Sequence, residues 1–207
     1  MNKTDLLNKI VGLPTSDGRQ MVAIAGPPAS GKSFLAEWLA TELNHSGQAV
    51  KVIPMDGFHL DNRLLEQRGL LNRKGAPETF DAAGFVHLVE RIKHDGTHIY
   101  PLFDRARDIA IAGAEEISEA CRLVIFEGNY LLFDQEPWQA LNTMWDLSVW
   151  LATPQSVTRE RCVQRWLDHG LSQDDAILRA EQNDVKNAQL INRCNLPAHV
   201  TLHEGDW

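Results

Sequence analysis

Gly26-Pro27-Pro28-Ala29-Ser30-Gly31-Lys32-Ser33 is the stretch that decides the fold, because it separates the apolar run 21–25 from an amphipathic run that begins at Phe34. It has the pattern G-x-x-x-x-G-K-[ST] of a Walker A phosphate-binding loop, which requires a preceding strand and a following helix. The two glycines allow a tight turn with inward-pointing N–H groups, and the helix dipole adds positive potential. We therefore expect these eight residues to bind a nucleotide; an ordinary Gly/Pro-rich turn is the alternative.

Lys32 and Ser33 would supply the charge and the metal ligand of this loop. The Lys32 ammonium is expected to reach the β- and γ-phosphates, and the Ser33 hydroxyl is expected to join the coordination shell of a magnesium ion. ATP and Mg²⁺ are therefore the expected cofactors.

The length and composition favour one α/β domain over residues 1–207 that works on small molecules. The three cysteines, Cys121, Cys162 and Cys194, are odd in number and lack metal-ligand spacing, so they indicate reduced thiols and a cytoplasmic location. The net charge of −8 argues against nucleic-acid or membrane partners. No run approaches the length of a secretion signal or a membrane span.

Periodicity predicts an alternation of strands and helices along the chain. A short helix over 3–11 and a turn over 14–18 lead to the first strand, 21–25. The further expected helices are 34–45, 82–94 with Asp81 as its cap, one opened by Pro154, and 174–194; the further strands are 49–55, 97–103, 123–127, 146–153 and 199–202. A strand–loop–helix–strand order builds a parallel sheet whose ligand crevice lies at the carboxyl ends of the strands.

Asp56 stands at such a carboxyl end, followed by Gly57-Phe58-His59. A carboxylate there can accept the proton of a substrate hydroxyl or contact the metal, which makes Asp56 a candidate catalytic and substrate-binding residue. A simple Asp-Gly turn is the alternative. His59 either lines the acceptor site or packs under the loop.

Two charged segments are candidates for contact with the phosphoryl acceptor. Residues 60–79 carry four cations that could bind an anionic substrate group or merely face solvent: Arg63, Arg68, Arg73 and Lys74. Asp104 and Arg105 lie in the charged segment 101–108, and we favour a role for both in the acceptor pocket over a surface salt-bridge cluster.

Glu127 ends the apolar run 123–126 and occupies the place of a Walker B acid beside the P-loop. It is expected to act on magnesium directly or through a water, together with Ser33. Tyr130 follows closely and belongs either to the acceptor pocket or to the core.

Arg161 and Arg165 are four residues apart on the helix after Pro154, so they project from one face. We expect the region of about 155–175 to form a lid whose arginines neutralise charge on the transferring phosphoryl group. A solvated helix face is the alternative.

Together, the P-loop, Asp56-Gly57-Phe58-His59, the segment 101–108, the strand end 125–128 and the helix arginines resemble the pantothenate kinase, uridine kinase and phosphoribulokinase family. Residues 52–81 look especially like type I pantothenate kinase. Pro-Leu-Phe-Asp-Arg at 101–105 and Asn183-Asp184…Asn187-Ala188 are similar to fructokinase-like proteins described as fructose transport system kinases. The Tyr-Ser-His run of pantothenate kinase and the His-x-Arg of uridine kinases are missing.

The resemblance implies a three-layer P-loop NTPase fold with a parallel five-stranded sheet flanked by helices and a helical lid. It implies that Asp56 is the base, that Lys32 and Ser33 bind phosphate and magnesium, and that Arg161 or Arg165 is the lid arginine. It places Asn187 near the acceptor.

We therefore expect an ATP- and Mg²⁺-dependent kinase that phosphorylates an alcohol, a sugar such as fructose or a pantothenate-like metabolite. A uridine or nucleoside kinase and a nucleotide-dependent regulatory ATPase are the alternatives. A homodimer is a further option, because three tryptophans offer apolar surface: Trp138, Trp145 and Trp150.

Overall fold

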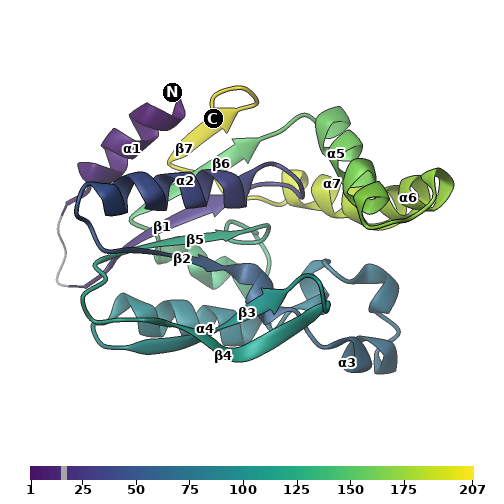
Figure 1. Ribbon diagram of the computed structural model, residues 1–207, viewed down its shortest axis with the longest axis horizontal. Helices are drawn as coiled ribbons and strands as arrows, with labels where there is room; N and C mark the ends of the chain where they lie inside the picture. Colours follow the sequence, from purple (N-terminus) through teal and green to yellow (C-terminus); the bar gives the residue numbers. More distant parts are fainter. Residues whose placement is uncertain (15–17) are drawn as a thin grey trace.

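The computed structural model describes residues 1–14 and 18–207, so the turn expected over 14–18 falls largely outside the described residues. Its main sheet has five parallel strands in the order β2-β5-β1-β6-β7 (Figure 1). Their bounds are Gln20–Ala25 (β1), Val50–Pro54 (β2), Leu123–Gly128 (β5), Leu147–Ala152 (β6) and Val200–His203 (β7). The α/β class and the parallel five-stranded sheet are confirmed.

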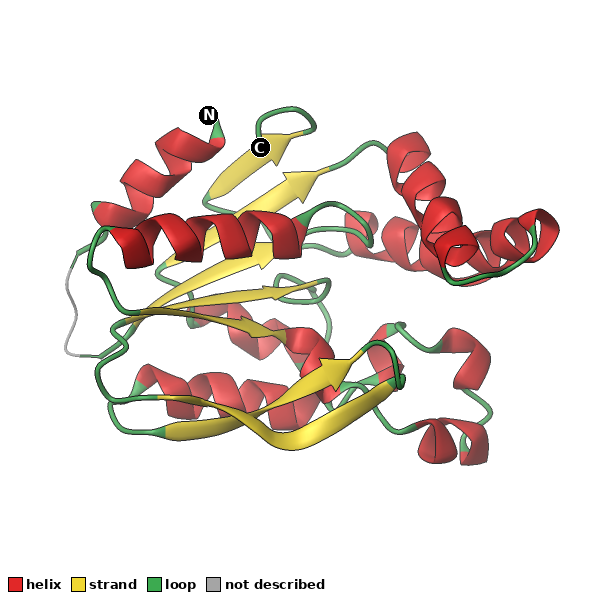
Figure 2. Cartoon of the chain, in the orientation of Figure 1, coloured by secondary structure: helices red, strands yellow, loops and turns green. Residues whose placement is uncertain are grey.

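Helices cover both faces of this sheet. Alternate β1 side chains serve two separate cores, because successive residues of a strand point to opposite faces. Val22 and Ile24 pack with α1 (Lys3–Val11) and α2 (Lys32–His45), while Met21 and Ala23 pack with α4 (Ala82–Lys93) and the 3₁₀ helix η4 (Trp138–Thr143). Figure 2 shows the sheet between these two helical layers.

The strand expected over 97–103 exists as β3 (His98–Asp104), but it does not join the main sheet. It pairs antiparallel with β4 (Ile109–Ile117), a strand that the sequence did not predict. In Figure 1 this hairpin lies beside α4. Between β2 and α4 the chain forms α3 and three 3₁₀ turns: η1 (Met55–Phe58), α3 (Asn62–Gln67), η2 (Leu71–Arg73) and η3 (Pro77–Thr79).

The helices after β6 form a protruding unit, here called the helical arm (Figure 1). It consists of α5 (Gln155–Asp168), α6 (Gln173–Arg179), a π-helical turn η5 (Ala180–Asp184) and α7 (Val185–Arg193). The helical spacing predicted over 174–194 is confirmed, with the π-turn as the unpredicted interruption. Such turns are rare and often mark functional sites.

The three tryptophans named as dimer surface are buried, with exposed fractions of 2% for Trp138, 6% for Trp145 and 9% for Trp150. That reason for expecting a homodimer is wrong, because the three indole rings are buried in the core and do not form a surface for a partner. All three cysteines are free thiols. In the ranges 1–14 and 18–207, no helix is both long and apolar enough to cross a membrane.

Candidate active site

The strand register brings three predicted site segments to one edge of the sheet. Ala25, the last residue before the P-loop, pairs with Gly128, so Glu127 lies next to the loop. Pro54 of β2 pairs with Glu127, which places Asp56 two residues beyond that point. Because the strands are parallel, all three ends converge at the carboxyl edge, as the sequence predicts.

The P-loop is held in a conformation that depends on Gly31. Its φ is +90°, and a Cβ at this position would come 2.8 Å from the Trp207 indole nitrogen. Helix α2 then begins at Lys32, whose ammonium donates to the Pro27 carbonyl at 2.8 Å. Ala29 also adopts a positive φ of 58°. Strain of this kind is concentrated at functional sites, where it orients backbone groups for a ligand.

Lys32 is almost completely buried, and burial lowers its pKa to about 8, although the nearby Glu127 and Asp56 carboxylates oppose this shift. The carboxyl of Glu127 is also buried, and burial followed by repulsion from Asp56 raises its pKa. The nearby Lys32 ammonium and Ser33 hydroxyl act in the opposite direction on this pKa. The loop and the adjoining end of β5 thus hold a cation and an acid that are both poorly solvated, which strengthens their interaction with an arriving phosphate or metal.

Ser33 and Glu127 fit a magnesium ion, because both supply hard oxygen ligands at adjoining positions. Among the described residues, no group of three or more His, Cys, Asp or Glu side chains could hold a metal. An ion held by these two residues would take its remaining ligands from phosphate and water, which is how Mg²⁺ is usually bound in nucleotide sites.

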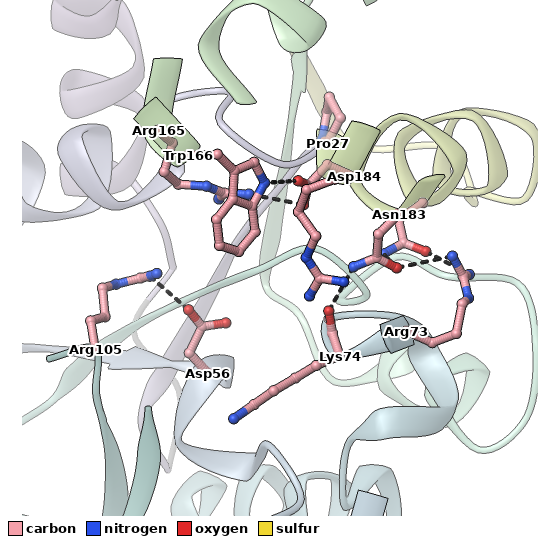
Figure 3. Close-up of polar contacts among 12 residues, drawn as sticks. Pro27, Asp56, Arg73, Lys74, Arg105, Arg165, Trp166, Asn183 and Asp184 are labelled. Atoms are coloured by element: carbon pink, nitrogen blue, oxygen red, sulfur yellow. Dashed lines mark hydrogen bonds and ion pairs between the residues drawn. The ribbon is translucent and has the colours of Figure 1, made fainter. Parts of the chain in front are cut away.

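Asp56 sits in η1, and Gly57 lets this turn lie against the hairpin. A Cβ on Gly57 would come 2.3 Å from the Pro101 carbonyl oxygen. The Asp56 side chain is 23% exposed and accepts a 2.7 Å hydrogen bond from Arg105 (Figure 3). The hairpin that was not predicted as such therefore positions the partner of the candidate base.

His59 packs between two aromatic rings, with centroids 4.1 Å from Phe80 and 4.6 Å from Phe103. Its Nδ1 lies 2.8 Å from the Asp56 carbonyl oxygen. Burial lowers the pKa of His59, so the imidazole is neutral near pH 7. It packs under the loop and also lines the cavity described next.

A cavity of about 660 Å³ opens between the P-loop, η1, the hairpin and the helical arm. Several predicted site residues line it: Pro28, Asp56, His59, Arg105, Arg165 and Asn187. Others were not assigned to the site: Asn62, Asp108, Trp166, Arg179 and Asp184. A cavity of this size suits a small metabolite.

The segment 71–75 forms one wall of the cavity and is bonded to the helical arm. Arg73 donates to Asn183 at 2.9 Å and to Asn187 at 3.0 Å, and Asn183 donates to the Lys74 carbonyl at 2.7 Å (Figure 3). Asn183 and Asn187 are each 1% exposed. Asn187 therefore lies near the expected acceptor site, where its side chain accepts from Arg73 and supports the wall.

The two candidate lid arginines have different surroundings. Arg165 lines the cavity and pairs with Asp184 at 2.8 Å, and Asp184 also accepts a 2.6 Å bond from the Trp166 indole (Figure 3). Arg161 instead pairs with Glu204 and donates weakly, at 3.4 Å, to the Ala29 carbonyl. Arg165 therefore lines the cavity, whereas Arg161 contacts Glu204 and the P-loop residue Ala29.

Two predicted acceptor residues lie away from the cavity. Asp104 pairs with Arg107 across the hairpin turn at 2.7 Å, which is the surface ion pair weighed as the alternative. Tyr130 is fully buried, and its hydroxyl donates to the Gly75 carbonyl at 2.7 Å. It therefore supports the cavity wall from behind.

The cations of the basic segment 60–79 fall into two groups, one exposed to solvent and one bonded to neighbouring residues. Arg63 and Arg68 are exposed, whereas Lys74 lines the cavity with a side chain only 10% exposed. Lys74 donates to Asn62 at 2.7 Å and pairs with Asp108 at 2.9 Å. Of the residues missed, Asp184 had a signal, because it belongs to the Asn183-Asp184…Asn187-Ala188 pattern that carries the family resemblance. Nothing distinguished Arg179 within the helical pattern 174–194.

Comparisons with known proteins bear on this site. No family model matches the chain. A protein of Schizosaccharomyces pombe provisionally named a uridine kinase is 33% identical, over 97% of this chain and 89% of its own length. A pantothenate kinase from Ligilactobacillus salivarius is 27% identical, over 78% of this chain and 54% of that enzyme.

A solved structure is also similar over nearly the whole chain. A protein of Silicibacter sp. TM1040, provisionally described as a fructose transport system kinase, is 53% identical with a TM-score of 0.94. The match covers 98% of this chain and 99% of that protein. The overall fold is thus shared over nearly the full length of both chains.

Proposed function

The chain belongs to the family of P-loop kinases that includes the uridine kinase-like and pantothenate kinase proteins, and we propose that it transfers the γ-phosphoryl group of ATP to the hydroxyl of a small alcohol. The observation that carries this proposal is the placement of Asp56 and the P-loop on one cavity, with Glu127 adjoining both. Such a cavity can hold a hydroxyl in line with a bound nucleotide, and positioning supplies most of the catalysis in phosphoryl transfer.

Asp56 orients the acceptor hydroxyl and takes its proton. The acceptor oxygen then forms a bond to the γ-phosphorus while the bond from that phosphorus to the bridging oxygen breaks, and ADP leaves. Arg105, whose side chain is 63% exposed, releases Asp56 or shares it when the hydroxyl arrives. Because the Arg105 side chain is long and exposed, this movement costs little free energy.

Lys32 binds the phosphates after leaving the Pro27 carbonyl, to which it donates in this structure. Ser33 and Glu127 would hold Mg²⁺, which neutralises charge on the β- and γ-phosphates when bound. Arg165 supplies a further positive charge at the cavity wall. These groups stabilise the charge that spreads over the equatorial oxygens of the transferring group.

The region of about 155–175 acts as a lid over a single kinase domain that spans residues 1–207. Support comes from the helical arm, which protrudes beyond the sheet and reaches the cavity through Arg165 and Trp166. Closure of such an element excludes water and limits hydrolysis of ATP without an acceptor. The location we propose is the cytoplasm, where reduced conditions keep the three free thiols unpaired.

The acceptor is a sugar such as fructose or a pantothenate-like metabolite. A nucleoside such as uridine is the second candidate, and its support is the provisional name of the fission-yeast relative. Acceptor choice depends on a few polar contacts in the cavity, which differ between members of one fold.

The test is ADP formation from ATP against a panel of fructose, other sugars, pantothenate, glycerate and nucleosides, with a control lacking acceptor. Strong stimulation by one compound, abolished when Mg²⁺ is omitted, supports the kinase. Steady hydrolysis that no compound stimulates would favour a regulatory ATPase instead.

A further inference from the structure

Among the described residues, four lysine and arginine side chains line the acceptor cavity, and three of them are neutralised by carboxylates on the same walls. Arg105 pairs with Asp56 at 2.7 Å and Arg165 pairs with Asp184 at 2.8 Å. Lys74 pairs with Asp108 at 2.9 Å. These pairs leave little uncompensated charge, and the neutral His59 adds none.

Arg179 is the fourth cation, and within residues 1–14 and 18–207 it has no such partner. Its Nη1 donates to the Asn72 carbonyl at 2.7 Å, and its guanidinium carbon lies 5.1 Å from the Trp166 ring centroid. No carboxylate of the described chain pairs with it within 4.0 Å. The half-buried guanidinium is therefore fixed by a carbonyl and an aromatic face, with several N–H donors left for a ligand.

The position of Arg179 separates it from the nucleotide. It lies at the end of α6 and donates a hydrogen bond to the carbonyl of Asn72, which belongs to the cavity wall formed by the segment 71–75. Arg161, in contrast, contacts the P-loop carbonyl of Ala29, and Arg165 is close enough to Lys32 to influence its pKa. The positive charge that no described carboxylate neutralises, that of Arg179, therefore lies beside the cavity wall where we place the acceptor.

We propose that Arg179 binds an anionic group, a carboxylate or a phosphate, carried by the acceptor whose hydroxyl lies at Asp56. This inference rests on the proposed kinase function and narrows its acceptor class to hydroxy acids, sugar acids and sugar phosphates. A guanidinium held in place by Asn72 and Trp166 offers a preorganised fork for such an oxyanion. Neutral sugars and nucleosides would leave this cation without a partner.

Matched acceptor pairs test the inference by turnover: glycerate against glycerol, pantothenate against panthenol, and fructose 6-phosphate against fructose. The anionic member of at least one pair is expected to have a kcat/KM higher by about tenfold or more, which corresponds to one charge-assisted hydrogen bond. In Arg179→Gln that preference is lost through a higher acceptor KM, with the KM for ATP unchanged. Arg179→Lys retains part of it.

The matched control is Arg159→Gln, which also removes a cation from the helical arm. Arg159 pairs with Glu181 and does not line the cavity. It is expected to keep the wild-type preference, and both variants should keep the wild-type melting temperature. Preference for the neutral member, or an anionic preference that Arg179→Gln leaves intact, would overturn the inference while leaving the kinase proposal standing.

A binding measurement decides the inference even if no pair is turned over. With the P-loop occupied by magnesium and a non-hydrolysable ATP analogue, calorimetry of inorganic sulfate should show one saturable site. That site should weaken by about tenfold or more in Arg179→Gln and not in Arg159→Gln. Absence of the site, or equal binding in both variants, would contradict the role of Arg179, whereas failure of every acceptor counts against the kinase.

Discussion

Arg105 donates a 2.7 Å hydrogen bond to Asp56, so the proposed catalytic base is held in an ion pair by the hairpin before any acceptor binds (Figure 3). The pair fixes the carboxylate at the cavity. Because Arg105 is mostly exposed, this contact contributes little to stability and can be exchanged for an acceptor hydroxyl.

Asp56→Asn is expected to lower kcat by about 10²–10⁴-fold, because the amide keeps the shape but cannot accept the hydroxyl proton. Arg105 can still donate to the amide oxygen, so the fold and the affinity for ATP should remain close to wild type. Steady-state kinetics and calorimetric titration with ATP measure the two effects separately. Unchanged turnover would remove Asp56 from the role of base.

The pH dependence of nucleotide binding should follow Lys32, whose pKa burial lowers to about 8. Below that pH the ammonium is charged and binds phosphate; above it the free enzyme loses this charge, so kcat/KM for ATP should fall as pH rises past about 8. In Lys32→Arg the guanidinium stays charged, so the alkaline fall should disappear even if overall activity is lower. A wild-type profile that stays flat well above pH 8 would contradict the assignment.

Arg165→Ala is expected to reduce kcat by about 10²-fold or more, since a lid arginine stabilises charge in the transition state. Arg161→Ala should change kcat by less than about threefold, because Arg161 is paired with Glu204 and contacts the P-loop through a long, 3.4 Å hydrogen bond to the Ala29 carbonyl. The reverse order would show that Arg161 is the arginine that reaches the phosphoryl group.

A control is needed because Arg165→Ala leaves the carboxylate of Asp184 buried without its cation. The double variant Arg165→Ala/Asp184→Asn removes that charge while the Trp166 indole keeps an acceptor. It should recover the melting temperature but not kcat. Recovery of both would reduce Arg165 to a structural residue.

Gly57→Ala is expected to lower activity, although Gly57 is not among the residues that we place in contact with the substrate. The added Cβ would come 2.3 Å from the Pro101 carbonyl oxygen, so η1 and the hairpin must separate. We expect a loss of about 1–3 kcal/mol in the free energy of unfolding and a lower kcat, because Asp56 moves with η1. Gly12→Ala, with its nearest contact at 3.4 Å, is the control and should alter neither.

The P-loop, Asp56 and Glu127 could be placed from the sequence because each directly follows or ends a strand of one parallel sheet. The carboxyl ends of such strands meet at one edge, so local pattern alone determines proximity. The sequence identified Arg161 and Arg165 as a pair on one helix face. It could not show which of the two lines the cavity, because helical spacing does not reveal which side chain points there.

Other features depend on contacts between distant residues. Strand β4 was missed because its half-exposed segment, IAIAGAEEI, carries charges and a glycine that disfavour strands. Asp104 and Arg105 are neighbours that take part in different ion pairs, one with Arg107 and one with Asp56. The partners of Asp184, and the lack of a carboxylate beside Arg179 among the described residues, arise only when the helical arm packs near the wall.

The most direct test is phosphorus NMR of a reaction that contains the enzyme, ATP, Mg²⁺ and the acceptor that best stimulates ADP formation. The account predicts a new phosphomonoester resonance that grows in step with ADP in the wild type and is nearly absent in Asp56→Asn. Release of inorganic phosphate in place of a phosphomonoester, or equal product from the Asp56→Asn variant, would contradict transfer to an alcohol with Asp56 as the base.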